Sequence, residues 1–192
     1  INGSEWAIEN GFGFQEDLQF TEENGKLKNA DPEFVSDRAI ERGLDQTGTL
    51  GSGNHFLEVD VVEKIYDEFA ANIFGLFEGQ IVLQIHTGSR GLGYQICDDY
   101  LKILVKAEKK YGFNLPDKQL ACAPVKSKEG QEYLSAMRCA ANYAWNNRQI
   151  IMHLAKKCLK ETFNLSESDL GFHLIYDVCH NIAKIEEHMI DG

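Results

Sequence analysis

Three histidines stand beside turns marked by glycine or asparagine, and their imidazoles are the side chains of this sequence best suited to binding a metal ion. His55 comes directly before an apolar run, His86 ends a second run, and His180 follows a third. A single histidine at such a position is more often a structural group. Three in comparable positions favour a shared site for a divalent transition metal, although their wide separation in the sequence is not itself proof.

The segment after His86 has the layout of an anion-binding loop. A short apolar run, typical of a buried strand, leads into Thr87-Gly88-Ser89-Arg90-Gly91-Leu92-Gly93, and a helical pattern follows. Glycines allow the backbone to approach a ligand closely, and the start of a helix offers unpaired N–H groups. Arg90 would add a planar guanidinium that fits a phosphate.

Two further charged residues have competing interpretations. Glu58 follows His55 by three residues, so in a regular strand the two side chains point to opposite faces, and a shared pocket would need a bulge or a strong twist. Arg42 ends a predicted helix, where an arginine most often complements the negative end of the helix dipole.

Hydrophobic periodicity and turn residues predict an α+β protein, with mixed β-sheets flanked by helices. We expect irregular structure over residues 1–30 and a long helix near 130–163, or two abutting ones within 129–163. Asn142 and residues 146–149 put many polar groups on that helix, and we expect them to bridge neighbouring backbone rather than bind a ligand. The other predicted elements are helices at 32–42, within 60–79 and at 94–111, strands at 56–62, 80–86 and 170–179, and a helical or turn segment at 182–188.

Composition is that of an ordinary globular protein. The chain has 192 residues, of which 43% are hydrophobic, and this length predicts one domain. A net charge of -11 argues against a broadly basic surface that would coat nucleic acid. Five cysteines without CxxC spacing favour a reducing cytoplasm over a disulfide framework. No apolar run has the roughly 20 residues that cross a bilayer, so no membrane contact is expected.

Four segments, in order along the chain, resemble successive motifs of the RtcB family of tRNA-splicing RNA ligases. The likeness extends from about Arg42 to the end of the sequence, and four motifs in order are far more specific than any single one. The segments are residues 51–58 (GSGNHFLE), 86–93 (HTGSRGLG), 140–148 (AANYAWNNR) and 176–183 (YDVCHNIA).

The resemblance implies a GTP- and manganese-dependent enzyme that joins RNA 2′,3′-cyclic phosphate or 3′-phosphate ends to 5′-hydroxyl ends, in tRNA splicing or RNA repair. It implies RNA partners, such as tRNA halves or broken ends, and leaves room for an activating protein. The implied manganese ligands are His55, His86 and His180, and the implied phosphate-binding residues for RNA are Arg90 and Arg42. The implied GTP-binding residues are Asn54, His55, Phe56, Leu57, Glu58, His180 and Asn181.

The departures from the family pattern define the remaining alternatives. Family members carry an upstream aspartate and cysteine that complete the metal centre and a downstream histidine that becomes guanylylated, and no segment here matches them. Cys179 is not at the position of that cysteine. Because the sequence begins without methionine, we expect the central part of a longer catalytic domain, inactive by itself. A metal-dependent phosphoesterase and a non-catalytic metal- or nucleotide-binding module stay open as alternatives.

Overall fold

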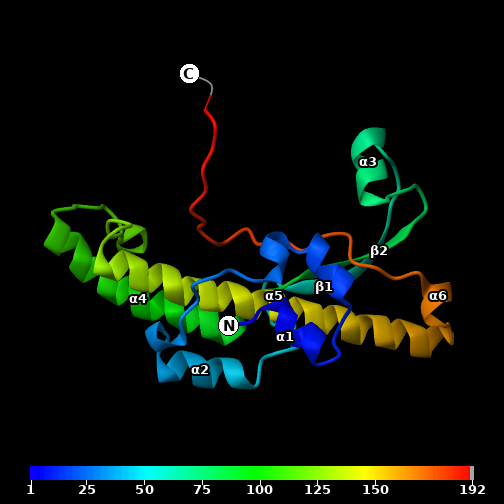
Figure 1. The fold of residues 1–192 in the computed structure, drawn as a ribbon, viewed down its shortest axis with the longest axis horizontal. Helices are drawn as coiled ribbons and strands as arrows, with labels where there is room; N and C mark the ends of the chain where they lie inside the picture. Colours follow the sequence, from blue (N-terminus) through cyan, green and yellow to red (C-terminus); the bar gives the residue numbers. More distant parts are fainter. Residues whose placement is uncertain (191–192) are drawn as a thin grey trace.

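A computed structural model describes residues 1–190, and one long helix, α5 (Lys128–Phe163), runs through it (Figure 1). At 1.5 Å per residue its 36 residues span about 54 Å. The helix begins where the Ser127 hydroxyl accepts the N–H of Gly130, and it ends at Asn164 in a left-handed conformation. The predicted long helix is therefore confirmed as a single continuous element.

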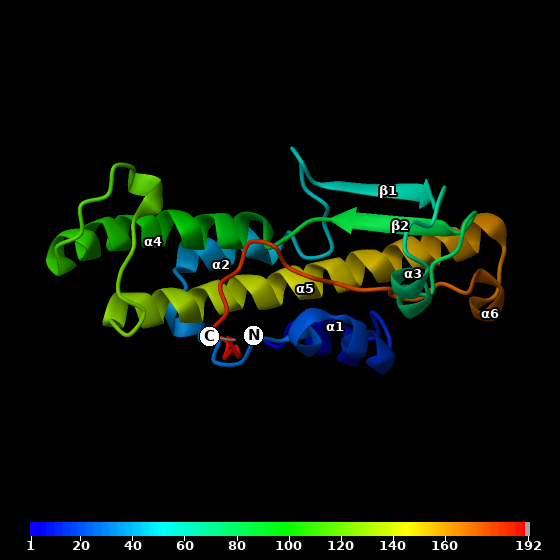
Figure 2. The ribbon, with the colours of Figure 1, turned by 90° about the horizontal axis from the view of Figure 1, so that it is seen from above.

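Two further helices build the core against α5. In the described residues, α4 (Arg90–Tyr111) packs along α5, and α2 (Asp37–Leu44) packs on α4 (Figure 2). Small side chains allow these helices to approach closely, and the buried cluster between them is Val35, Ala39, Ile96, Tyr100, Ala136 and Cys139. Although α4 and α5 have the length to cross a bilayer, neither has the apolar composition, and no other helix within residues 1–190 meets both conditions.

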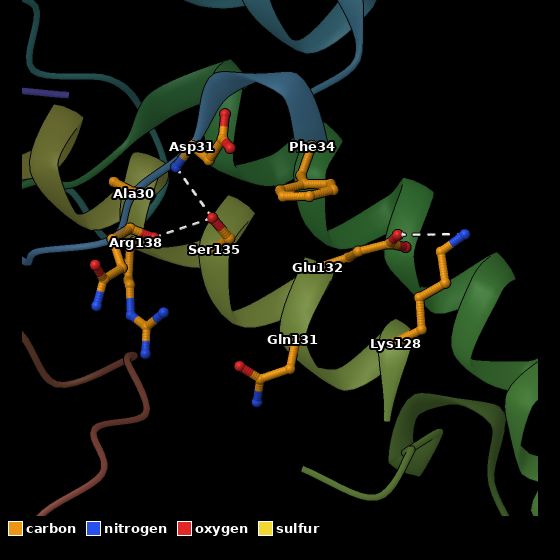
Figure 3. Close-up of a pocket in the computed structure, with 9 residues that line it drawn as sticks. Ala30, Asp31, Phe34, Lys128, Gln131, Glu132, Ser135 and Arg138 are labelled. Carbon is orange, nitrogen blue, oxygen red and sulfur yellow. Dashed lines mark hydrogen bonds and ion pairs between the residues drawn. The ribbon is translucent and has the colours of Figure 1, made fainter. Parts of the chain in front are cut away.

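The N-terminal segment wraps α5 with short helical turns. They are α1 (Ser4–Glu9) and the 3-10 helices η1 (Gln15–Phe20), η2 (Glu22–Gly25) and η3 (Pro32–Phe34). Polar groups of α5 hold this segment in place: the Ser135 hydroxyl accepts the N–H of Asp31 and donates to the carbonyl of Asn29, each at 3.0 Å (Figure 3). Asn142 likewise bonds both backbone groups of Leu27. The expected bridging role of Asn142 is confirmed.

A two-stranded antiparallel sheet lies beside α5. Strands β1 (Phe56–Val61) and β2 (Ile81–His86) pair in an unbroken register from Phe56 opposite His86 to Val61 opposite Ile81. The connection carries α3 (Glu68–Phe74), which ends at Gly75 in the left-handed conformation. The α+β class is confirmed, but the expectation of mixed sheets is wrong for the described residues, where this antiparallel pair is the one sheet.

The predicted strand at 170–179 is also wrong. This segment does not pair with another strand along its length. Asp177 makes one isolated parallel β-bridge, with Thr21. Its alternating apolar residues have the period of a strand, but a strand also needs a partner with free backbone groups along its length. The helical or turn segment predicted at 182–188 is likewise wrong, because residues 182–190 form neither a helix nor a turn.

Helix boundaries differ from the prediction at two places. The predicted helix 32–42 divides into η3 and α2, because the Ser36 side chain accepts the N–H of Ala39 and starts a second helix. Helix α4 begins at Arg90, four residues before the predicted start. The remaining short elements, η4 (Lys118–Leu120) and α6 (Glu167–Leu170), flank α5 in the sequence.

The side chain of Trp145, on α5, is completely buried. Replacing it with alanine should lower the free energy of unfolding by about 3–5 kcal/mol, because a large cavity would remain. Chemical denaturation measures this loss. Trp6 is 44% exposed and provides a matched control, so Trp6→Ala should cost at most about 1 kcal/mol. Equal losses of unfolding free energy in the two variants would contradict a greater contribution of Trp145 to the packed core.

Candidate functional site: a cleft with three histidines

The three predicted histidines come together, although three separate segments carry them. The ring centroid of His86 lies 6.1 Å from that of His55 and 5.3 Å from that of His180. His86 is the last residue of β2, and His55 directly precedes β1, whose first residue, Phe56, contacts the His86 ring edge-to-face. His180 follows the isolated bridge at Asp177 rather than the predicted strand.

Gly51 makes the close approach around His55 possible. A Cβ atom at this position would overlap both the Nδ1 atom of His55 and the Nη1 atom of Arg90. Gly51 also has φ +109°, a conformation that L side chains rarely adopt. Burial lowers the pKa of His55 below its ordinary value, and the charges of Arg90 and His86 lower it further. The ring is thus held in its neutral form, which carries a free lone pair.

The two loops that carry His55 and His86 are tied directly to each other. The buried Thr87 hydroxyl donates to the carbonyl of Leu50 at 2.5 Å. Between the loops, the Asn147 side chain bonds the backbone of Thr49 and the carbonyl of Gly88. These bonds fix the entry to β1 against the exit from β2.

A buried ion pair joins the third segment to the same helix. The Nε and Nη2 atoms of Arg148 both lie 2.7 Å from the same carboxylate oxygen, Oδ1 of Asp177, and Nη2 also lies 3.4 Å from the sulfur of Cys179. Burial raises the pKa of Asp177, and the facing guanidinium opposes this rise. Burial also raises the pKa of the Cys179 thiol, so this side chain is a protonated neighbour of Arg148 and not a thiolate.

Both predicted phosphate-binding arginines line the same cleft. Arg90 has φ +54°, a strained conformation for a residue other than glycine, and its Nε donates to the Thr49 hydroxyl at 3.2 Å. Arg42 lies in the last turn of α2, donates to Gln95 at 2.9 Å and stacks over the ring of Tyr94. The interpretation of Arg42 as a helix-end residue and its place beside the cleft are both compatible with this geometry.

The cleft has a volume of about 1830 Å³ and lies among β1, β2, α5 and residues 170–182. Of the predicted site residues, Glu58 and Leu57 are outside its lining. Cross-strand pairing places Phe56 and Glu58 on the same face as His86, while Leu57 lies on the other face. His55 precedes the ladder and lines the cleft, whereas Glu58 does not, so the two side chains do not line this cleft together. The predicted residues that line the cleft are Arg42, Asn54, His55, Phe56, His86, Arg90, His180 and Asn181.

The donor set fits a divalent transition metal. The His86 ring lies near both other imidazoles, and the Nδ1 atom of His55 is buried without a hydrogen-bond partner, which is the state expected of a nitrogen that ligates a metal. The rings are not drawn into a finished coordination sphere: within residues 1–190, no three His, Cys, Asp or Glu side chains are arranged to hold an ion. Their role as ligands stays a prediction.

Comparison with known proteins identifies the family. The family model described as "tRNA-splicing ligase RtcB" matches residues 1–192. The chain belongs to the RtcB family. Its relatives include proteins named tRNA-splicing ligase RtcB from Methanocaldococcus jannaschii, 59% identical over 190 residues, and from Archaeoglobus fulgidus, 56% identical over 192. These matches cover 99% and 100% of the chain.

The RtcB relatives are much longer than this chain. It spans 20% of the Methanocaldococcus jannaschii protein and 40% of the Archaeoglobus fulgidus protein. The relative from Pyrococcus abyssi is 53% identical over 192 residues, which are 21% of its length.

Sequence reasoning missed two groups that hold this RtcB site together. Asp177 lies in an apolar run, and a carboxylate in such a run was the available signal for a buried ion pair. Thr87 gave no signal, because a threonine in a glycine-rich loop is ordinary. Asn147 and Gln149 bridge backbone, as predicted, and Gln149 bonds the carbonyl of Phe12.

Gly51→Ala should disturb His55 and Arg90 together. We expect a loss of about 1–3 kcal/mol in unfolding free energy from the left-handed backbone. The displaced His55 ring should also show a pKa closer to the ordinary value of about 6.5, measured by NMR titration. Gly53→Ala is the control, because φ is +74° there but no atom lies near the added methyl group. If Gly53→Ala shifted the His55 pKa equally, crowding at Gly51 would not be the cause.

Proposed function

We propose that this chain forms part of the catalytic centre of a GTP- and manganese-dependent RNA ligase that joins 2′,3′-cyclic phosphate or 3′-phosphate ends to 5′-hydroxyl ends. RtcB family membership and the name of the relatives, tRNA-splicing ligase, support ligation of RNA in tRNA splicing. The convergence of His55, His86 and His180 at one cleft is the single observation that carries the proposal to these residues.

In this proposal the three histidines hold manganese by their neutral imidazoles. A bound divalent ion would neutralise phosphate charge and favour phosphoryl transfer. The protein's contribution is to keep the rings on rigid supports: β2 for His86, the tied loops for His55, and the Asp177 segment for His180. Such supports matter because a ligand set must be fixed before a substrate arrives.

Glu58 and the amides at the cleft are proposed to recognise the guanylate. A carboxylate accepts from the N1 and N2 donors of guanine, whereas adenine offers no such pair of donors. Asn54 directly precedes His55, and Asn181 directly follows His180. Both line the cleft, and their amides can contact ribose or phosphate oxygens. Glu58 shares the sheet face of His86, so a nucleotide lying along that face would reach both.

The arginines are proposed to bind the RNA end. A guanidinium binds phosphate through two parallel hydrogen bonds, and Arg90 lines the cleft together with the histidines. Its position beside His55, across Gly51, would bring a terminal phosphate next to the metal ligands. Arg42 would extend the contact along the cleft.

The decisive experiment places this chain in a complete relative. The 192 residues should replace the matching region of the Archaeoglobus fulgidus protein, and the purified chimaera should be assayed for joining a 3′-phosphate RNA to a 5′-hydroxyl RNA with GTP and Mn²⁺. We expect ligation by the chimaera and none by its His86→Ala form, which should also lose bound manganese. A folded chimaera that cleaves RNA without GTP would instead indicate a phosphoesterase.

Glu58→Ala should weaken GTP binding by the same chimaera by about 10- to 100-fold, because a hydrogen bond to a charged group contributes about 1.5–3 kcal/mol. Isothermal titration calorimetry measures the affinity for GTP, and the manganese content of the chimaera should not change. Glu63→Ala is the matched control, an exposed carboxylate two residues beyond β1. Undiminished GTP affinity in Glu58→Ala would remove this residue from the guanine site.

A further inference from the structure

Two consecutive residues of α5 reach the three segments that carry the histidines. Asn147 has a completely buried side chain and makes four hydrogen bonds to backbone. Its oxygen accepts the N–H groups of Gly48 and Thr49 at 2.7 and 3.1 Å, and its nitrogen donates to the carbonyls of Thr49 and Gly88, both at 3.1 Å. This amide therefore bridges the segment before His55 and the loop after His86.

Arg148 makes the corresponding bridge to His180. Its side chain is only 11% exposed, and its Nη1 donates to the carbonyl of Thr87 at 3.0 Å, one residue after His86. The other two nitrogens bind Asp177 and contact Cys179, the residue directly before His180. One guanidinium thus connects the immediate neighbours of two predicted metal ligands.

The local backbone does not supply this alignment. His86 ends a strand, but His180 follows a single isolated bridge and lies in a segment without helix or ladder. The bridge to Thr21 and the bond from the Cys179 N–H to Glu22 attach that segment to the N-terminal region, not to β2. The Arg148 side chain is what connects it to the loop after His86.

We propose that Asn147 and Arg148 are positioning residues that set the mutual placement of the three imidazoles, Asn147 between His55 and His86 and Arg148 between His86 and His180. The proposal rests on the metal-binding role proposed above for the histidines. It gives a role to the polar part of motif 140–148, which contains none of the predicted metal ligands. Groups that orient metal ligands typically change metal affinity about 10- to 100-fold when they are removed.

Asn142 provides a matched control on the same helix. It is also completely buried and also bonds backbone, through Leu27 and Ile1, but it touches none of the histidine segments. Asn142→Ala and Asn147→Ala should therefore both lower thermal stability. A role confined to folding predicts that manganese affinity follows stability in both variants.

Manganese titration of the chain and its variants, below the unfolding temperature of each, tests the proposal. We expect Asn147→Ala and Arg148→Met to bind Mn²⁺ about 10- to 100-fold more weakly, and Asn142→Ala to bind like the original chain. Arg148→Lys keeps a cation beside Asp177 but not the planar fork. It should recover stability without recovering affinity. Recovery of both together, or equal weakening in Asn142→Ala, would overturn the proposal.

A second measurement does not depend on the metal. In the isotope-labelled chain, NMR should show a nuclear Overhauser contact between the rings of His86 and His180, whose centroids lie 5.3 Å apart. Arg148→Met should lose this contact and Asn142→Ala should keep it. If the original chain bound no manganese, the proposed metal-binding role of the histidines would fail. The contact between the His86 and His180 rings would still test whether Arg148 positions them. Retention of the contact in Arg148→Met would contradict it.

Discussion

The cleft depends on hydrogen bonds between buried side chains of one helix and the backbone of irregular loops. Loops that run inside a protein carry N–H and C=O groups that water cannot reach, and each unpaired group costs about 1–3 kcal/mol. Helix α5 supplies the partners through Asn142, Asn147, Arg148 and Gln149, which bond four separate stretches of chain. An apolar helix of the same shape would leave these loops without a defined position.

The Arg148–Asp177 pair shows why such polar contacts specify geometry more than they stabilise. Two buried charges lose hydration that their attraction barely repays, so an apolar pair of similar volume is often at least as stable. A guanidinium, however, has donors in fixed directions, and here they reach a carboxylate and a carbonyl from two different segments. The direction of these bonds, rather than their net energy, places residues 177–180 beside the end of β2.

Local features of the sequence were sufficient to predict the elements on which the histidines depend. The strands at His55 and His86 and the long helix all follow from patterns within a few residues. The strand predicted at 170–179 failed because pairing depends on a neighbour elsewhere in the chain. For the same reason, spacing alone could not bring His180 to His86: that approach depends on Asp177 meeting Arg148, 29 residues away.

The charge distribution is consistent with binding an RNA end rather than an RNA surface. A net charge of -11 opposes the approach of a polyanion, and extended contacts would need many cations. The cleft instead carries two arginines and three histidines, and Arg90 lies beside His55 across Gly51. Under the proposed function, arginines confined to one cleft would bind a terminal phosphate without holding the rest of a strand. An enzyme that joins broken RNA ends must distinguish a terminal phosphate from the internal phosphates, because an intact strand has internal phosphates but no free end at the break.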